Sequence, residues 1–399
     1  MQQLKRNTIA FSLAHATFAQ CILLGSGTAM AQDADKATAA QPAEQMDRIV
    51  VTATRRNTFV QETPLAVTAF NQDTLQNNQV KDLASLATMV PSLVVEQHGD
   101  SGGVHVYMRG VGSANHTELG DPAVAFYVDG VYSPRPQGAT ALMYDLSHVE
   151  VARGPQGTLN GRNSTAGAVN LVSAAPSTAK FMGSAGITVG DYRHLQTQGM
   201  LNIPFSDDVA LRIAAIKDSH DGTVDFRRGS NVMPGTAKYG AGDQMGVRAS
   251  LLWKFTPQLR GTFIADYFLD QGAGNVFLAA EPAPGTKLRS ALIDTPGTLD
   301  QSILTYKGKL NYKPTEALDF TYLGSWSRYK RQNSNDADAG LFPGFKSENR
   351  TDWAQFDSYS HELQARSDDD APFQWVAGLF LFNEKNKVRF DIDRSQISQ

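Results

Sequence analysis

Apolar and polar residues alternate along most of the chain beyond residue 180, and few folds accommodate such a pattern. In residues 247–255, Leu251 and Trp253 fall on one side of an extended chain, and Arg248 and Ser250 fall on the other. Because successive side chains of a β-strand point to opposite faces, this alternation predicts strands with one apolar and one polar face. The same pattern recurs in residues 259–269, 318–326 and 358–366.

The composition narrows the class of protein. Hydrophobic residues make up 41% of the 399 residues, charged residues only 19%, and the formal net charge is −4. An acidic balance does not favour a nucleic-acid partner, which requires clustered Lys and Arg. Beyond the first 31 residues, no apolar run approaches the ~20 residues that a membrane-spanning helix needs. The remaining candidates are a soluble β-sandwich and a transmembrane β-barrel, because both show alternation of this kind.

The N-terminus has the pattern of a secretory signal peptide. Lys5 and Arg6 precede a largely apolar stretch at residues 9–24, and Ala-Met-Ala at residues 29–31 provides a cleavage site. We therefore expect a signal peptide at residues 1–31. Its removal would take away Cys21, the only cysteine of the chain, which suits an oxidising envelope and excludes a disulfide framework.

Residues 32–56 join this leader to the rest of the chain. Residues 32–46 are small, polar and without pattern, which is typical of a flexible periplasmic tether. Residues 47–56, DRIVVTATRR, are instead rich in β-branched side chains. Such a segment can add itself as a strand to the sheet edge of another protein, or it can be the first strand of the next domain. The residues alone leave both interpretations open.

Residues 57–177 predict one small mixed domain. Strands are expected at residues 64–70, 93–97, 104–108 and 123–128, and a helix at residues 82–89. At its end, residues 145–177 predict a strand at 148–152, a glycine-broken loop without a helix, and a strand at 168–172. The loop motif consists of Gly154, Pro155, Gly157, Gly161, Arg162 and Gly167. A phosphate-binding P-loop would need Lys followed by Ser or Thr where this loop has an arginine.

Four motifs, in the same order and spacing, resemble those of the TonB-dependent outer-membrane receptors. They are IVVTATRR, MRGVG, DPAVAFYVDGVY and VEVARGPQGTLNGRNSTAGAVNLVSAAPS. The first resembles a TonB box, and the others resemble the plug domain. The resemblance implies a mixed α/β plug domain (57–177) followed by an antiparallel transmembrane β-barrel (178–399), which has about 22 strands in plugged transporters. It also implies energy supply by TonB with ExbB–ExbD, and contact with outer-membrane lipid.

The resemblance also assigns roles to single residues. In the TonB box (47–56), the TonB-binding residues would be Ile49, Val50, Val51, Thr52 and Ala53. In the plug, Arg109 and Arg153 match arginines that pair with barrel glutamates in the family, and Glu362 looks like the barrel partner because alternation turns it inward. We refer to these three residues as the expected charge lock. The alternative is that the arginines cap loops.

The number of strands bears on how much of a barrel is present. We expect about nine strands from residue 181 onward, with room for a tenth from Val388, against about 22 in plugged transporters. Long polar inserts at residues 221–243, 271–301 and 331–356, set against short turns, are typical of outer-membrane barrels. The chain also ends in RSQISQ, without an apolar terminal strand, and the expectation is therefore an incomplete barrel.

No catalytic constellation, cofactor motif or metal-ligand spacing is evident among the eight histidines and the acidic residues. We therefore do not expect an enzyme. The predicted function is energised uptake of a scarce nutrient across the outer membrane, with a ferric siderophore as the first candidate ligand. A carbohydrate, cobalamin or an aromatic compound is the alternative cargo. A passive pore or adhesion barrel is the alternative class, and it would need neither a TonB box nor a plug.

Overall fold

The computed structural model describes residues 50–52, 55–56, 58–97, 104–113, 115, 119–135, 143–226, 239–274, 290–291, 297–336 and 349–393. Contacts divide the chain into a first unit, Met1–Asp47, and a second, Arg48–Gln399, and every described residue lies in the second. Within it we call residues 50–177 the plug, and the sheet that begins at residue 182 the wall.

The plug contains short strands, two helices of one to two turns, and two single turns of helix. Its elements are β1 (Val50–Val51), β2 (Thr58–Phe59), the 3-10 helix η1 (Val60–Glu62), β3 (Val67–Asn71), α1 (Gln72–Asn77), α2 (Leu83–Ala87), β4 (Leu93–Gln97), β5 (Val104–Met108), β6 (Val124–Val128), β7 (Val131–Ser133), β8 (Leu146–Arg153), α3 (Gly157–Asn160) and β9 (Gly167–Ser173). The strands form a five-stranded sheet of order β3-β8-β9-β6-β7 and two pairs, β1-β2 and β4-β5.

Local sequence explains where the plug helices begin. The Asn71 side chain accepts the Thr74 N–H at 2.9 Å and caps α1. Asp82 and Ser85 form a reciprocal capping box at the start of α2, which satisfies amides that have no partner within the helix. The same helix buries Leu83 and Leu86 completely in the plug core. No helix in the described ranges is both long and apolar enough to cross a membrane.

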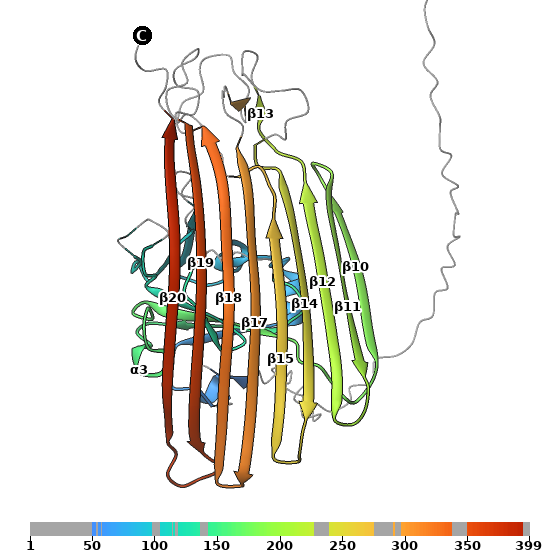
Figure 1. Cartoon of the computed structure of the whole chain (residues 1–399), viewed down its shortest axis with the longest axis vertical. Coiled ribbons are helices and arrows are strands. Elements are labelled where there is room, and N and C mark those ends of the chain that lie inside the picture. Colours follow the sequence, from blue (N-terminus) through green and yellow to red (C-terminus); the bar gives the residue numbers. More distant parts are fainter. Residues whose placement is uncertain are drawn as a thin grey trace, which may run out of the picture. The chain divides into compact units, whose positions relative to one another are not determined.

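The wall is one antiparallel sheet of nine strands, each paired with the next in chain order (Figure 1). Its strands are β10 (Met182–Gly190), β11 (His194–Pro204), β12 (Val209–His220), β14 (Gly242–Lys254), β15 (Leu259–Asp270), β17 (Thr298–Thr315), β18 (Leu318–Asp336), β19 (Asn349–Ser367) and β20 (Val376–Asp393). Two further short strands, β13 (Asp225–Phe226) and β16 (Ser290–Ala291), pair with each other. The expected strand count of about nine is confirmed, but Val388 lies inside β20 and starts no tenth strand.

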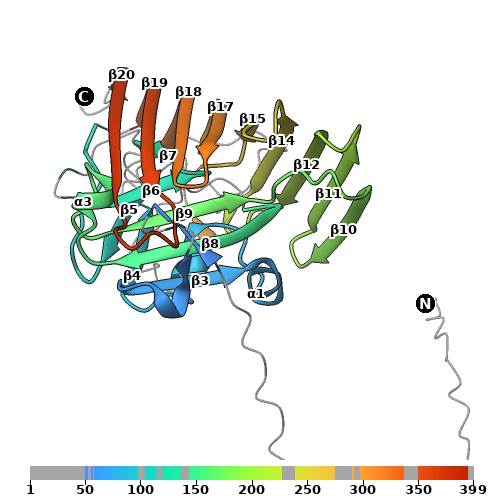
Figure 2. The same cartoon turned by 90° about the horizontal axis from the view of Figure 1, so that it is seen from below.

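The predicted alternation places side chains on two distinct faces of the wall. On β19, Ser358 and Ser360 are buried on the inner face, whereas Tyr359 and Leu363 are 45% and 51% exposed on the outer face. The aromatic residue Trp253 of β14 is likewise exposed on the outer side. The wall curves, and the plug lies on its concave side (Figure 2). The polar face of the wall therefore meets the plug, and the apolar face points away from it.

Connections at the two ends of the wall differ in length. Residues 205–208, 255–258, 316–317 and 368–375 make the shorter connections at one end, which we call the turn end. The longer connections lie at the other end, the loop end, together with the short turn at residues 191–193. The prediction of a long insert at residues 331–356 was wrong in its bounds, because β18 continues to Asp336 and β19 starts at Asn349. The polar residues at the end of β18 and the start of β19 lie in strands, so polarity alone did not distinguish strand from loop here.

The segment at residues 145–177 is largely as predicted. Strands β8 and β9 extend each expected strand by one or two residues at its ends and pair with each other in antiparallel register. The loop, however, includes the helical turn α3, where no helix was expected. The backbone N–H groups of Asn160 and Gly161 donate to Gln156 and Gly157, which closes a single turn too short to leave a periodic apolar signal.

Candidate functional site at the plug–wall interface

The expected TonB box lies against the rest of the plug where the structure describes it. Strand β1 pairs in antiparallel register with β2, and Val51 is fully buried while Val50 is 41% exposed. The next residue, Thr52, donates its backbone N–H to Glu150 Oε1 at 2.7 Å, and its hydroxyl lies 3.1 Å from the same oxygen. Ile49 and Ala53, the two remaining residues of the expected set, fall outside the described residues.

Glu150 is the residue that holds this segment. It projects from β8, is 2% exposed, and also receives the Asn170 side-chain amide at 3.3 Å. His148 Nε2 lies 3.0 Å from Glu150 Oε1. A buried carboxylate needs such donors, because without them its desolvation would cost several kcal/mol, on the order of 3 or more. The described part of the box is therefore attached to the plug by a residue that sequence analysis did not single out.

One member of the expected charge lock, Glu362, has an ion-pair partner that does not belong to the expected set. Glu362 points to the inner face of β19, as alternation predicted, but its ion-pair partner is Arg55, at 3.6 Å. Arg153 keeps a buried Nε without a hydrogen-bond partner, and Arg109 lies next to Gly154, with NH1 3.3 Å from where a Cβ at that glycine would be. A pairing of Arg109 or Arg153 with a barrel glutamate stays a prediction.

Four further ion pairs connect the plug side of the interface to the wall. They are Arg135 with Glu384, Asp145 with Arg212, Asp129 with Lys307, and Arg56 with Asp369. The first three are nearly buried on both partners, so they are the pairs in which loss of one charge is most costly. In two of the four, the carboxylate belongs to the plug and the cation to the wall. Alternation could have placed Glu384, Arg212 and Lys307 on the inner face, whereas Asp369 lies in the connection between β19 and β20. Nothing local identifies the partners of these residues.

The glycine-rich loop motif has two roles in the structure. Gly154 and Gly161 adopt positive φ angles of 103° and 71°, which an L side chain rarely does. At Gly167, an added Cβ would lie 2.3 Å from Met108 Sδ and 2.4 Å from the Ala152 carbonyl oxygen. The motif therefore permits turns and close strand packing, while Pro155 and Gly157 precede and begin the turn α3.

Arg162, the charged member of the motif, lies at the rim of the plug. Its guanidinium lies 3.0 Å from Asp121 and 5.3 Å from the ring centroid of Phe382 on β20. Both partners of the ion pair are about half exposed, so the pair itself contributes little. The cation–π contact adds one more link between plug and wall.

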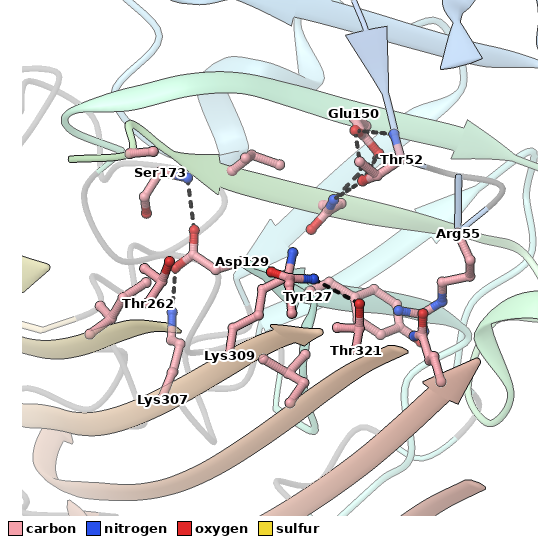
Figure 3. A pocket seen from close by; sticks show the side chains of 18 of the residues that line it. Thr52, Arg55, Tyr127, Asp129, Glu150, Ser173, Thr262, Lys307, Lys309 and Thr321 are labelled. Carbon is pink, nitrogen blue, oxygen red and sulfur yellow. Dashed lines mark hydrogen bonds and ion pairs between the residues drawn. The ribbon is translucent and has the colours of Figure 1, made fainter. Parts of the chain in front are cut away.

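A cavity of about 310 Å³ separates the box and the plug sheet from the wall (Figure 3). Tyr127, Asp129 and Glu150 line it from the plug, and Lys307 and Lys309 line it from the wall. Burial raises the pKa of Tyr127 well above its usual value, with Arg55 opposing the shift, so its hydroxyl stays protonated and donates to the Asn160 carbonyl at 2.6 Å. Among the described residues, no group of three or more His, Cys, Asp or Glu could hold a metal ion.

Comparison with known proteins identifies the plug domain and similar receptors. The family model of the TonB-dependent Receptor Plug Domain matches residues 60–168. The pesticin receptor of Yersinia pestis is 30% identical over 207 residues, which are 51% of this chain and 28% of that receptor. A probable TonB-dependent siderophore receptor, PiuA, of Acinetobacter baumannii is 25% identical over 197 residues, or 47% of this chain and 25% of its own length. The chain spans about a quarter of the length of these curated relatives.

Solved structures extend the similarity into the wall. The ferric yersiniabactin uptake receptor FyuA from Yersinia pestis superimposes with a TM-score of 0.72 at 21% identity, covering 83% of this chain and 50% of FyuA. A plug packed against the polar face of amphipathic antiparallel strands defines the class of plug-containing outer-membrane barrel proteins. Within that class, residues 60–168 belong to the family of TonB-dependent receptor plug domains, and the described part of the chain comprises this plug and nine antiparallel strands with the fold of such a receptor.

Proposed function

We propose that this receptor takes up a ferric siderophore across the outer membrane, with energy supplied through TonB. The observation that carries the proposal is the state of the box. Val50 and Val51 form a two-residue strand that, among the described strands, belongs to no part of the wall and pairs with β2. A short strand of this kind can leave β2 and add to the sheet edge of TonB, since main-chain hydrogen bonds of the same type form in both places.

The cargo is proposed from the relatives. Receptors for ferric yersiniabactin and for pyoverdine share the fold, and the similar sequences include a probable siderophore receptor. Another organic nutrient is the alternative cargo. A passive pore is disfavoured, because diffusion through an open barrel uses neither a plug nor a segment that pulls on it.

Replacement of Val51 by proline tests the energised step. Proline removes the backbone N–H and fixes φ, so V51P cannot contribute a regular strand to TonB. In cells that depend on this receptor, we expect V51P to abolish uptake of radioactive iron from the ferric siderophores that the wild type uses. Binding of the same chelates to the cell surface at low temperature should remain, because the loops are unchanged.

The matched control is Ala40→Pro, which places a proline in the expected tether and should leave uptake intact. Uptake by V51P at the wild-type rate would contradict a TonB-coupled mechanism. A wild-type chain that supports growth on a carbon source, and imports no ferric chelate from a broad panel, would instead replace the cargo and leave the mechanism standing.

A further inference from the structure

A second, smaller cavity lies along the same inner face of the wall. It has a volume of about 100 Å³ and is lined by Ile303 and Thr305 of β17, towards the loop end. The larger cavity is lined by Lys309 and Asn311 of the same strand, towards the turn end. Lys307 lines both cavities. The two cavities therefore follow one another along the interface between plug and wall, with Lys307 at the boundary.

The boundary is closed by an ion pair between plug and wall. Lys307 Nζ lies 2.7 Å from Asp129 Oδ2, and the two side chains are 5% and 13% exposed. Asp129 Oδ1 also accepts the Ser173 backbone N–H at 2.8 Å. Asp129 and Gly130 form the tight β6–β7 turn with φ angles of 56° and 81°. This turn carries the carboxylate to the wall, so Lys307 is neutralised only while the turn stays in place.

The larger cavity, which we call the lower chamber, has more positive than negative charge. Two of its arginines, Arg55 and Arg366, have carboxylate partners in Glu362 and Asp319. Since the charges of each such pair cancel, these arginines add nothing to the net charge of the chamber. The excess of positive charge comes from cations that have no carboxylate partner.

Arg260 and Lys309 also line the lower chamber, and neither forms an ion pair with a described carboxylate. The carboxylates that act on Lys309 from a longer distance, Asp129 and Asp319, are paired with Lys307 and Arg366. They stand on neighbouring strands, where Arg260 is opposite Asn311 and Lys309 is opposite Thr262. Both side chains are accessible to solvent. Glu150, the other carboxylate of the chamber, keeps its negative charge while it accepts hydrogen bonds from Thr52, and the two cations outnumber it. Two cations on one face of a cavity attract and retain an anion.

We propose that the lower chamber is a binding site for an anionic group, and that Lys307 completes it when the β6–β7 turn withdraws and removes Asp129. The inference rests on the proposed uptake function and deepens it, because the cargo would then carry a carboxylate or a similar anionic group. Cargo that moves from the smaller cavity at the loop end into the lower chamber would meet Lys307 first, followed by Lys309 and Arg260. Withdrawal of the turn would both open the boundary and add the third cation.

The test measures the charge preference of the chamber without any uptake. Thr262 lines the chamber opposite Lys309, and the variant T262C places a thiol there in a chain that also carries C21S. Rates of reaction with a sulfonate-bearing and a trimethylammonium-bearing methanethiosulfonate are compared in the full chain, folded in lipid vesicles. We expect T262C to prefer the anionic reagent by about tenfold relative to Q258C, which places the thiol in an exposed turn.

Further substitutions that change the charge of the chamber are then added to T262C, and the reagent preference of each variant is compared. D129N should raise the preference for the anionic reagent further, because Lys307 loses its neutralising partner, and the double variant R260Q/K309Q should reduce it to about one. Lys330→Gln is the matched control, because it removes a cation from the exposed, opposite face of the wall and should change nothing. Citrate should slow the labelling of T262C in the wild-type background and not in R260Q/K309Q, whereas glucose should slow neither.

A ratio near one for T262C in an otherwise wild-type background, or protection by citrate that survives R260Q/K309Q, would overturn the anion site. A preference that D129N leaves unchanged would overturn the role of Lys307. If D129N fails to fold, the first comparison and the double variant still decide the site. None of these readouts depends on uptake, so failure of the site and failure of the proposed function are distinguishable.

Discussion

Single buried carboxylates decide how the N-terminal segment and the plug are held. Glu150 accepts hydrogen bonds from Thr52 and Asn170 and holds the described end of the expected TonB box. Asp129 pairs with Lys307 and holds the plug against the wall. Hydrogen bonds to charged groups contribute about 1.5–3 kcal/mol each, which is comparable to the free energy of local opening. One side chain can therefore determine whether such a segment is attached.

Replacement of Glu150 by alanine should release the box. E150A removes the acceptor for the Thr52 N–H and hydroxyl, so β1 would keep its two-residue pairing with β2, the burial of Val51 and the 3.3 Å contact of Asn170 with the Thr52 hydroxyl, and its attachment would weaken. We expect a spin label at residue 50, introduced as Val50→Cys, to change from an immobilised to a largely mobile spectrum. Glu96→Ala, an exposed position on β4, is the matched control and should leave the label immobilised. An equally immobile label in both variants would show that Glu150 is not the holding residue.

Asp129 should make the attachment of plug to wall insensitive to pH over the neutral range. Burial by itself would raise its pKa, but Lys307, Arg248 and the Ser173 amide outweigh burial and lower the pKa from 3.8 to about 2. A depressed folded-state pKa stabilises the folded state above the unfolded-state value and loses this effect as pH falls. The contribution should therefore be constant from about pH 8 to about pH 5 and disappear between about pH 4 and pH 2.

Thermal unfolding of the plug against pH measures this contribution. The wild type should lose stability between about pH 4 and pH 2 more steeply than D129N, which lacks the titrating group. Parallel curves for the two proteins across that range would argue against the assignment of the ion pair.

At the scale of elements, the packing of β5, β8 and β9 explains the glycine-rich motif. Gly167 begins β9 where Met108 of β5 and the backbone of Ala152 in β8 leave no room for a side chain. Gly157 begins α3, and nothing lies within 4 Å of where its Cβ would be. The two glycines belong to one motif, yet only one of them is required by close approach of neighbouring elements.

Alanine substitution at Gly167 should lower the stability of the plug, whereas alanine substitution at Gly157 should not. G167A places a Cβ 2.4 Å from a backbone oxygen that cannot move without breaking the β8–β9 pairing, and overpacking of this kind costs about 1–3 kcal/mol. G157A meets no obstacle and should leave the plug as stable as the wild type or slightly more stable. Chemical denaturation of the two variants provides the comparison. Equal midpoints for G167A and the wild type would contradict the packing argument.

At the scale of the whole molecule, successive residues of each wall strand point alternately outward to lipid and inward to the plug. Leu363 points outward and is 51% exposed, whereas its neighbour Gln364 points inward and lines the lower chamber. Ion pairs such as Arg135 with Glu384 join the inner face to the plug. A single-residue step along a strand therefore changes the environment of a side chain from hydrocarbon to a polar interior.

A lysine placed on the outer face should destabilise the protein more than a lysine placed on the inner face. L363K would put a cation against lipid, which costs up to about 2–4 kcal/mol at the bilayer midplane and less near the interface. Q364K would put the same cation into the solvated chamber and should cost much less. Folding into lipid vesicles, followed by resistance to heat and detergent on gels, measures both variants. Similar folding yields for the two would contradict the assignment of the faces.

Much of the architecture could be predicted from the sequence, because it depends on local patterns. Alternation determined which residues of the wall face the plug, including Glu362, and β-branched and glycine-rich segments determined most plug strands within one to three residues. The helical turn α3 and the extent of β18 and β19 could not be predicted, since a single turn and a polar strand leave no periodic apolar signal. The motifs also sufficed to identify the plug domain.

The pairing across the interface was decided only by the tertiary structure. Alternation fixes the face on which Glu362 or Lys307 lies, but its partner depends on how the plug is rotated and how far it reaches along the strands. Contacts between residues more than a hundred positions apart are set by the packing of complete elements. For this reason Glu362 meets Arg55, Lys307 meets Asp129, and two cations, Arg260 and Lys309, are left facing a cavity.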